Sequence, residues 1–240
     1  MNNLKGKTAL VTGSAKNLGK AIALDLARQG AKVAIHYNSS QKEANQTLKE
    51  IKRLSAGIAI QANLTNPSDV SSMILKIKSD LGPVDILINI VGNFIFEPIT
   101  KTSFEKFRDV IESNLYSTFL CSQKTLPIMI KKKWGRIINF GNVGAENVVI
   151  RKNTTPYFIA KAGVISLTKV LAYEYAKYGI TVNSISPGIL STSIVKAKTP
   201  SGRFAQFSDI INVVNFFIKD ESGYINGANI EVSGGWRTGF

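Results

Sequence analysis

The sequence has very few of the residues that form disulfides and metal sites. Among its 240 residues there is one cysteine, Cys121, and one histidine, His36. A single cysteine excludes an internal disulfide and suits a reducing compartment, and a lone histidine cannot form a metal cluster, so we expect no bound metal. No apolar run approaches the ~18 residues of a membrane-spanning helix, and the amino-terminal apolar run leads into a glycine turn rather than a cleavage site. We therefore expect a cytoplasmic protein that does not enter a membrane.

Acidic residues are also scarce, because 16 Asp and Glu face 30 Lys and Arg, which gives a net charge of +14. The chain is nonetheless 44% hydrophobic and only 19% charged, which excludes an intrinsically disordered protein. A basic chain can attract nucleic acid. Here only Lys131, Lys132 and Lys133 form a tight run, and no aromatic side chains alternate with them as a single-strand binding surface requires. We expect a charge spread over solvated faces and no nucleic acid partner.

Short apolar runs rich in β-branched residues alternate with longer amphipathic segments. This alternation is typical of βαβ units and of a parallel sheet that is buried on both faces. The expected strands cover residues 8–12, 32–36, 57–61, 84–89, 136–140, 181–185 and 228–232. The expected helices cover residues 17–29, 41–55, 67–80, 103–131, 156–178 and 207–219. Without a linker or a repeat, the pattern predicts one α/β domain over residues 1–240, doubly wound and Rossmann-type, with a seven-stranded, mostly parallel sheet.

A glycine-containing turn connects the first expected strand to the first expected helix. In such a turn, backbone N–H groups and the positive end of the helix dipole face the pyrophosphate of a dinucleotide. The residues expected at this contact are Gly13, Ser14, Lys16, Asn17, Leu18 and Gly19.

The end of the second expected strand indicates which nicotinamide cofactor is bound. An NAD enzyme places an acidic residue there, which binds the ribose 2′-hydroxyl and repels a 2′-phosphate. This chain instead has Tyr37, Asn38 and Ser39, with no acid until Glu43. Lys16 would add a cation beside a 2′-phosphate. We therefore expect NADP(H).

Tyr157 and Lys161 are four residues apart in an expected helix, so they lie on the same face. A nearby ammonium favours the phenolate form of tyrosine and lowers its pKa from about 10 towards neutral pH. Such a tyrosine can protonate a carbonyl oxygen as a hydride reaches the carbon.

With these motifs in order, the chain resembles the short-chain dehydrogenase/reductase family over about residues 5–236. The glycine turn resembles the family's T-G-x-x-x-G-x-G, with Asn17 in place of the middle glycine, and asparagine tolerates left-handed backbone well. Further similar segments are 89–92, 182–188, 223–227 and 233–236, together with Asn114. The arrangement is most similar to the 3-oxoacyl-[acyl-carrier-protein] reductases. The resemblance implies a Rossmann-type fold, nicotinamide-dependent carbonyl chemistry in fatty acid biosynthesis, and a homotetramer or homodimer.

The resemblance also implies roles for individual residues. Tyr157 would be the general acid, Lys161 would bind the ribose hydroxyls and tune Tyr157, and Asn114 would hold a water behind Lys161. The other residues implied to contact the cofactor are Asn63 and Leu64 near the adenine, Asn89, Val91 and Gly92 near the ribose, and Pro187, Gly188, Ile189 and Thr192 near the carboxamide.

One catalytic position departs from the family pattern. The family serine that hydrogen-bonds the substrate carbonyl aligns with Asn142 when the strand ends are matched, and with Gly144 when residues are counted back from Tyr157. An insertion of about two residues before Tyr157 would explain the difference. An asparagine amide can donate as a hydroxyl does, so we place Asn142 among the catalytic residues. The alternative is a catalytically weak dinucleotide-binding regulator.

The segment over the substrate, about residues 189–206, is shorter than the family's lid. Lys196, Lys198 and Arg203 would give it a positive rim, which suits an anionic substrate or an acidic acyl carrier protein, or is simply a solvated loop. The glycine turn also resembles that of pteridine reductases, which leaves a dihydropterin as an alternative substrate, although that group has Asp where this chain has Asn142.

Overall fold

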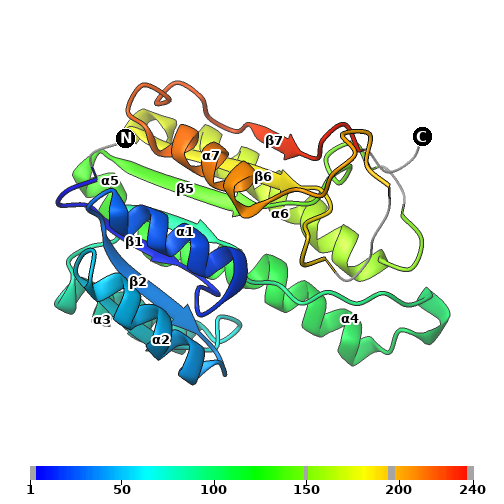
Figure 1. Ribbon diagram of the computed structural model, residues 1–240, viewed down its shortest axis with the longest axis horizontal. Helices are drawn as coiled ribbons and strands as arrows, with labels where there is room; N and C mark the ends of the chain where they lie inside the picture. The colour runs from blue at the N-terminus through cyan, green and yellow to red at the C-terminus, as the bar shows by residue number, and fades with distance from the viewer. Residues whose placement is uncertain (1–3, 149–150, 194–197, 237–240) are drawn as a thin grey trace.

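A single parallel sheet organises the chain. The computed structural model describes residues 4–148, 151–193 and 198–236, and within them seven strands pair in the order β3-β2-β1-β4-β5-β6-β7, every pair parallel (Figure 1). The strands are β1 (Thr8–Val11), β2 (Lys32–Tyr37), β3 (Gly57–Gln61), β4 (Ile86–Asn89), β5 (Gly135–Phe140), β6 (Ile180–Pro187) and β7 (Asn229–Val232). The predicted Rossmann-type fold is confirmed.

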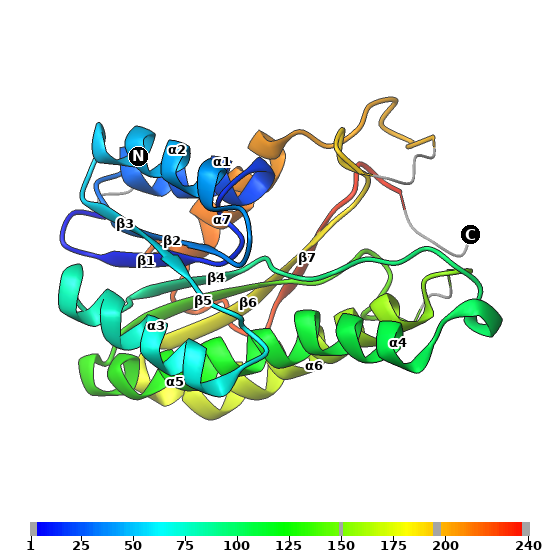
Figure 2. The same cartoon turned by 90° about the horizontal axis from the view of Figure 1, so that it is seen from below.

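Helices cover both faces of this sheet (Figure 2). One face carries α1 (Asn17–Arg28), α2 (Gln41–Lys52) and α7 (Phe207–Ile218), and the other carries α3 (Pro67–Asp80), α4 (Phe104–Ile111), α5 (Ser117–Lys132) and α6 (Thr155–Tyr175). Short 3-10 turns cover Ile99–Lys101 and Ala176–Tyr178, and a π-helical turn over Glu112–Tyr116 joins α4 to α5. None of the helices in the described ranges is long and apolar enough to cross a membrane.

Two apolar clusters, one on each face of the sheet, form the core. Alternate strand residues point to opposite faces, so β1 contributes Val11 to one cluster and Leu10 to the other. Ile22 of α1 and Phe217 of α7 pack in the first cluster, while Met73 of α3 packs in the second. Because both faces are covered, the strands are apolar along most of their length.

Most element boundaries agree with the sequence pattern, and the exceptions have local causes. Helix α3 covers its predicted range because Asn66 caps it, accepting a hydrogen bond from Ser68 N–H at 2.9 Å, and Pro67 suits the first helical position. The helix predicted to reach residue 178 changes to a 3-10 turn at Ala176, before Gly179 adopts left-handed backbone at φ 69°. The helix predicted over 41–55 ends at Lys52, and the one predicted over 103–131 is interrupted by the π-helical turn.

The topology determines where a ligand can bind. The chain runs outward from β1 through β2 to β3 and then returns to β4, so the strand order reverses between β1 and β4. Ligands of doubly wound sheets bind at the carboxyl ends of the strands beside such a reversal. Thr12 N–H donates to the Ile88 carbonyl oxygen at 3.0 Å and joins the two strand ends there.

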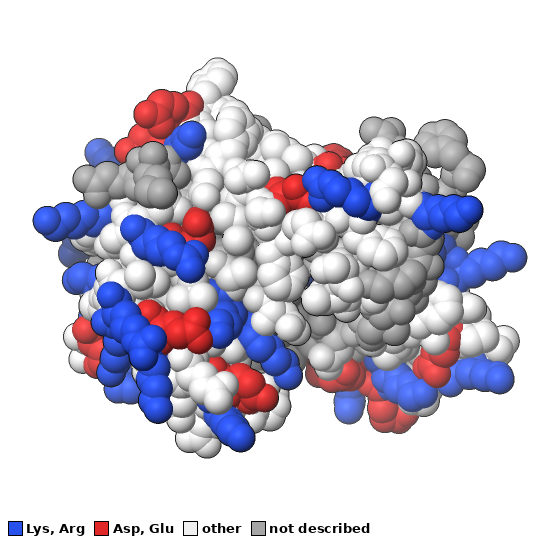
Figure 3. All heavy atoms as spheres, viewed as in Figure 1, with Lys and Arg blue, Asp and Glu red and all other residues white. Residues whose placement is uncertain are grey.

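Basic side chains do not gather in one patch on the face seen in Figure 3. Lys and Arg lie towards both ends of that face and alternate with Asp and Glu. This distribution agrees with the interpretation of the +14 charge as dispersed over solvated surfaces.

Candidate active site

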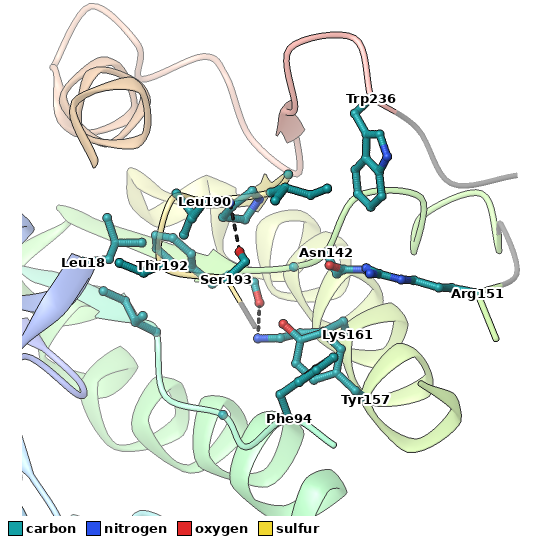
Figure 4. Close-up of a pocket in the computed structure, with 17 residues that line it drawn as sticks. Leu18, Phe94, Asn142, Arg151, Tyr157, Lys161, Leu190, Thr192, Ser193 and Trp236 are labelled. Atoms are coloured by element: carbon teal, nitrogen blue, oxygen red, sulfur yellow. Dashed lines mark hydrogen bonds between the residues drawn. The ribbon is translucent and has the colours of Figure 1, made fainter. Parts of the chain in front are cut away.

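A pocket of about 400 Å³ opens at the carboxyl ends of the central strands (Figure 4). Tyr157 and Lys161 reach it from α6, and Asn142 reaches it from the loop after β5. The predicted residues that line it are Leu18, Gly92, Asn142, Tyr157, Lys161, Pro187, Gly188, Ile189 and Thr192. Predicted residues from five separate segments of the sequence therefore meet in one cavity.

The glycine turn adopts the backbone expected from its sequence. Gly13 and Asn17 have left-handed backbone, with φ of 64° and 51°. The Cβ of any other residue at Gly19 would lie 2.4 Å from the Gly13 carbonyl oxygen, so the turn packs tightly on itself. Asn17 thus replaces a glycine without loss of the left-handed conformation.

His36 holds this turn in place through hydrogen bonds of its ring. Its Nδ1 accepts a hydrogen bond from Gly13 N–H at 3.0 Å, and its Nε2 lies 3.0 Å from the Ala62 carbonyl oxygen. Both bonds require a neutral ring protonated at Nε2. Burial lowers the pKa of His36 to about 4, so the ring is neutral at physiological pH. The histidine fixes the backbone of the loop.

Several predicted cofactor residues lie away from the pocket. Asn38 and Asn63 line a separate hollow beyond β2 and β3. Leu64 is buried in the core, and the Ser14 hydroxyl donates to the Val11 carbonyl oxygen at 2.6 Å. The Asn89 side chain points into the interior and donates to Asn139 Oδ1 at 2.9 Å. If Asn89 and Ser14 contact a cofactor, they must do so chiefly through their backbone.

The remaining predicted positions surround the glycine turn. Lys16 is exposed at the start of α1 and forms no side-chain cap there. Tyr37 is buried at the end of β2 and Ser39 is exposed two residues later. Val91 packs against Gly13, since a Cβ built on that glycine would lie 3.0 Å from Val91 Cγ2.

Tyr157 and Lys161 share a helical face as predicted, but their pKa values differ from the prediction. Lys161 Nζ lies 5.5 Å from the centroid of the Tyr157 ring and donates to the Phe140 carbonyl oxygen at 2.7 Å. Burial lowers the pKa of Lys161 to about 7. Burial raises the pKa of Tyr157 to about 12, and the charge of Arg151 opposes this rise. The expectation that Lys161 brings the pKa of Tyr157 towards neutral pH is therefore wrong for the protein alone, because burial raises this pKa and the charge that opposes the rise is that of Arg151.

Asn114 lies in the π-helical turn behind the pocket. Its Nδ2 donates to the carbonyl oxygens of Asn93 and Val110, both at 2.9 Å, and its Oδ1 is buried without a partner among the described residues. Its backbone carbonyl oxygen accepts a hydrogen bond from Thr118 Oγ1 at 2.7 Å. The proposed role of Asn114 in holding a water remains a prediction.

Comparison with known proteins identifies the family. A family model described as enoyl-(acyl carrier protein) reductase matches residues 13–237. The chain is 37% identical to the 3-oxoacyl-[acyl-carrier-protein] reductase FabG of Staphylococcus aureus over 241 residues, covering 95% of this chain and 97% of that protein. The chain belongs to the short-chain dehydrogenase/reductase family.

Further similar proteins agree with this membership. The FabG protein of Escherichia coli K12 is 35% identical over 244 residues, 97% of this chain and 98% of that protein. A solved putative short-chain alcohol dehydrogenase from Sinorhizobium meliloti superposes with a TM-score of 0.90 at 29% identity, covering 97% of each chain. A putative gluconate dehydrogenase from Agrobacterium tumefaciens superposes with a TM-score of 0.89 at 31% identity, covering 97% of this chain and 96% of that one. The protein is thus an oxidoreductase of a family that uses nicotinamide dinucleotides.

The structure separates the two positions that the sequence offered for the family serine. Asn142 lines the pocket, whereas Gly144 does not line it and donates from its N–H to Glu231 Oε1 at 2.8 Å. The position matched by strand ends therefore lines the pocket, and the position counted back from Tyr157 does not, while the catalytic role of Asn142 remains a prediction. One N–H of the Asn142 amide donates to the Val143 carbonyl oxygen at 3.2 Å, which leaves the second available.

One cation in the pocket was not predicted from the sequence, and one cation of the predicted positive rim is paired within the chain. Arg151, in the loop before α6, lines the pocket beside Tyr157. In the rim, the Arg203 guanidinium is paired with both carboxylate oxygens of Asp209, at 2.6 and 3.0 Å, and Lys196 lies outside the described residues. Arg203 is therefore engaged within the chain and is not free for an anionic ligand. The extra residues before Tyr157 are the only sequence signal that could have pointed to Arg151.

Proposed function

We propose that the protein is an NADPH-dependent carbonyl reductase in which Tyr157 donates a proton to the carbonyl oxygen. The observation that carries this proposal is the meeting of Tyr157, Lys161 and Asn142 in one pocket beside the glycine turn. A phenol, an ammonium and an amide N–H can together protonate and polarise a carbonyl.

The protonation state of Tyr157 suits reduction. With a pKa raised to about 12, its phenol keeps its proton at neutral pH and can act as an acid. After proton transfer, the buried phenolate requires nearby positive charge, which Lys161 and Arg151 supply. The Tyr157 ring makes an edge-to-face contact with Phe94, with the centroids 4.9 Å apart and an interplanar angle of 87°, which helps to fix its orientation.

The residues at the glycine turn fit a dinucleotide. The first N–H groups of α1 have no side-chain cap, so they are free to bind a pyrophosphate. No acid lies between Tyr37 and Gln41 at the end of β2, and Lys16 is exposed nearby, which favours a 2′-phosphate and hence NADPH over NADH. A bound NADPH would supply the hydride that reduces the carbonyl carbon.

The substrate we propose is a 3-oxoacyl thioester, in line with the names of the FabG relatives. A chain with a net charge of +14 would also attract an acidic carrier protein that presents such a thioester. The family expectation of a homotetramer or homodimer remains part of this proposal.

The decisive experiment measures NADPH oxidation with an acetoacetyl thioester. We expect turnover, and we expect Tyr157→Phe to lower kcat by about 10²–10⁴-fold, since the proton donor is lost. Tyr173→Phe is the matched control, because Tyr173 lies on the same helix but is 89% exposed. Dihydropterin in the same assay separates the pterin alternative. NADPH binding without turnover of any carbonyl would instead support the regulator.

A further inference from the structure

Arg151 occupies the side of the pocket opposite the glycine turn. In Figure 4, Leu18 and Thr192 lie on one side of Tyr157 and Lys161, and Arg151 lies on the other, near Asn142. Leu18 belongs to the first turn of α1, where the pyrophosphate of a dinucleotide would bind. The phosphates of the cofactor would therefore lie away from Arg151, and the guanidinium faces the space left for the substrate.

The described part of the chain provides no anionic partner for this guanidinium. The ion pairs among the described residues do not include Arg151, and the residues lining the pocket contain neither Asp nor Glu. Its guanidinium carbon lies 5.4 Å from the centroid of the Trp236 ring, so an aromatic face supports it.

The arginine is partly buried, and this has an energetic consequence. Burial lowers the pKa of Arg151, yet a guanidinium remains charged in proteins. A desolvated charge is unfavourable unless a partner compensates it. Among the described residues, the one titratable group that raises its pKa is Tyr157, which is neutral at physiological pH. The described residues thus place no negative charge beside this half-buried guanidinium.

We infer that Arg151 binds a carboxylate carried by the substrate, so that the enzyme reduces free oxo acids rather than the thioester that the names of the relatives suggest. This inference rests on the proposed reductase function. A carboxylate matches the planar guanidinium through two parallel hydrogen bonds, which also orients the molecule. Because Tyr157 lines the same pocket, a single small molecule would place its carboxylate on Arg151 and its carbonyl oxygen at the phenol. The cation that selects an anionic substrate is thus inside the pocket and not on the rim.

The test compares acetoacetate with methyl acetoacetate, which has the same carbonyl but no negative charge. We expect the wild-type protein to prefer the acid. We expect Arg151→Gln to lower the ratio of kcat/KM for the acid to kcat/KM for the ester by about 10- to 100-fold, the usual effect of a lost charged hydrogen bond. The kcat/KM for the ester reports any effect of Arg151 on Tyr157 alone, and the ratio reports the additional dependence on the substrate carboxylate. Lys152→Gln is the matched control, because it removes the neighbouring, exposed cation and should leave the ratio unchanged.

Other outcomes overturn the inference. If Arg151→Gln lowers kcat/KM equally for both substrates, the arginine acts only on Tyr157 and not on a substrate carboxylate. If Arg151→Gln changes neither kcat/KM value, and thermal melting shows a folded protein, the arginine acts on neither Tyr157 nor a substrate carboxylate. Arg151→Lys should retain part of the preference for the acid, because it keeps the charge but not the paired donors.

The failure of the proposed function can be recognised separately. If no carbonyl compound oxidises NADPH, the reductase proposal fails, and calorimetric binding of acetoacetate to the wild-type protein and to Arg151→Gln then decides the inference. Binding that requires Arg151 supports a carboxylate site, and equal or absent binding overturns it.

Discussion

The pH dependence of stability should depend on His36. This side chain is 2% exposed and holds the glycine turn through its hydrogen bond from Gly13 N–H. Protonation of Nδ1 removes the acceptor and places a charge in the core. The bond and the neutral ring are therefore lost together in acid.

The sign and magnitude follow from the two pKa values of His36. In the unfolded chain its pKa is 6.5, and in the folded protein burial lowers it to about 4. Between these values the unfolded chain binds more protons, so the free energy of unfolding decreases as the pH falls. Each pH unit is worth about 1.36 kcal/mol, so the full window contributes a loss of about 3 kcal/mol. Above pH 6.5 the neutral His36 contributes fully to the free energy of unfolding. Below pH 4 the folded and unfolded states both bind the proton, so His36 causes no further loss of stability.

Urea unfolding of the wild-type protein and of His36→Gln between pH 4 and pH 7.5 measures this contribution. We expect the difference in free energy of unfolding between them to shrink by about 3 kcal/mol towards pH 4, while the carboxylates shared by both proteins cancel. Since His36 is the one histidine of the chain, its imidazole NMR signals are also unambiguous and should not titrate between pH 8 and pH 5.5. A titration midpoint near 6.5, or a difference that does not change with pH, would refute the reasoning.

The other predictions concern the pocket and the glycine turn. Asn142→Ala should lower kcat by about 10²–10³-fold, the usual effect of losing one donor to the carbonyl oxygen, while Asn142→Ser should stay within about tenfold of the wild type; steady-state kinetics checks both. An Asn142→Ala variant as active as the wild type would show that the amide does not reach the substrate. Ser39→Asp should raise the KM for NADPH at least about tenfold, because its carboxylate repels the 2′-phosphate. The same variant should lower the KM for NADH, which has no 2′-phosphate and therefore serves as the control. Unchanged KM values for both cofactors would place the 2′-phosphate elsewhere.

The strands could be predicted closely from the sequence because a parallel sheet covered on both faces requires apolar, β-branched runs. The run 57–61 is a strand over exactly that range, and α3 covers its predicted range because Asn66 and Pro67 give a local start signal. The π-helical turn at Glu112–Tyr116 was not predicted, because such turns are rare and this one contains neither glycine nor proline to mark an interruption of the helix.

Site residues could be predicted where they belong to short motifs and could not where they depend on packing. The spacing of Tyr157 and Lys161 placed both on one helical face, and the end of β5 placed Asn142 in the pocket. Arg151 lies in an irregular loop, so no periodicity indicated the direction of its side chain. The pKa values of the site also depend on burial, which the spacing of two residues does not reveal.

The charges in the pocket explain how Tyr157 can keep its proton and still release it. Without a ligand, Arg151 opposes the effect of burial and lowers the pKa of Tyr157. A substrate carboxylate on Arg151 would neutralise that charge, so the phenol would hold its proton more firmly while the substrate binds. In the proposed reaction, the negative charge that develops on the carbonyl oxygen during hydride transfer would then draw the proton from Tyr157. The phenolate left behind would be stabilised mainly by Lys161, whose pKa, lowered to about 7 by burial, would rise as this new negative charge appears beside it. Arg151 would thus select the substrate, and Lys161 would stabilise the phenolate formed by the reaction.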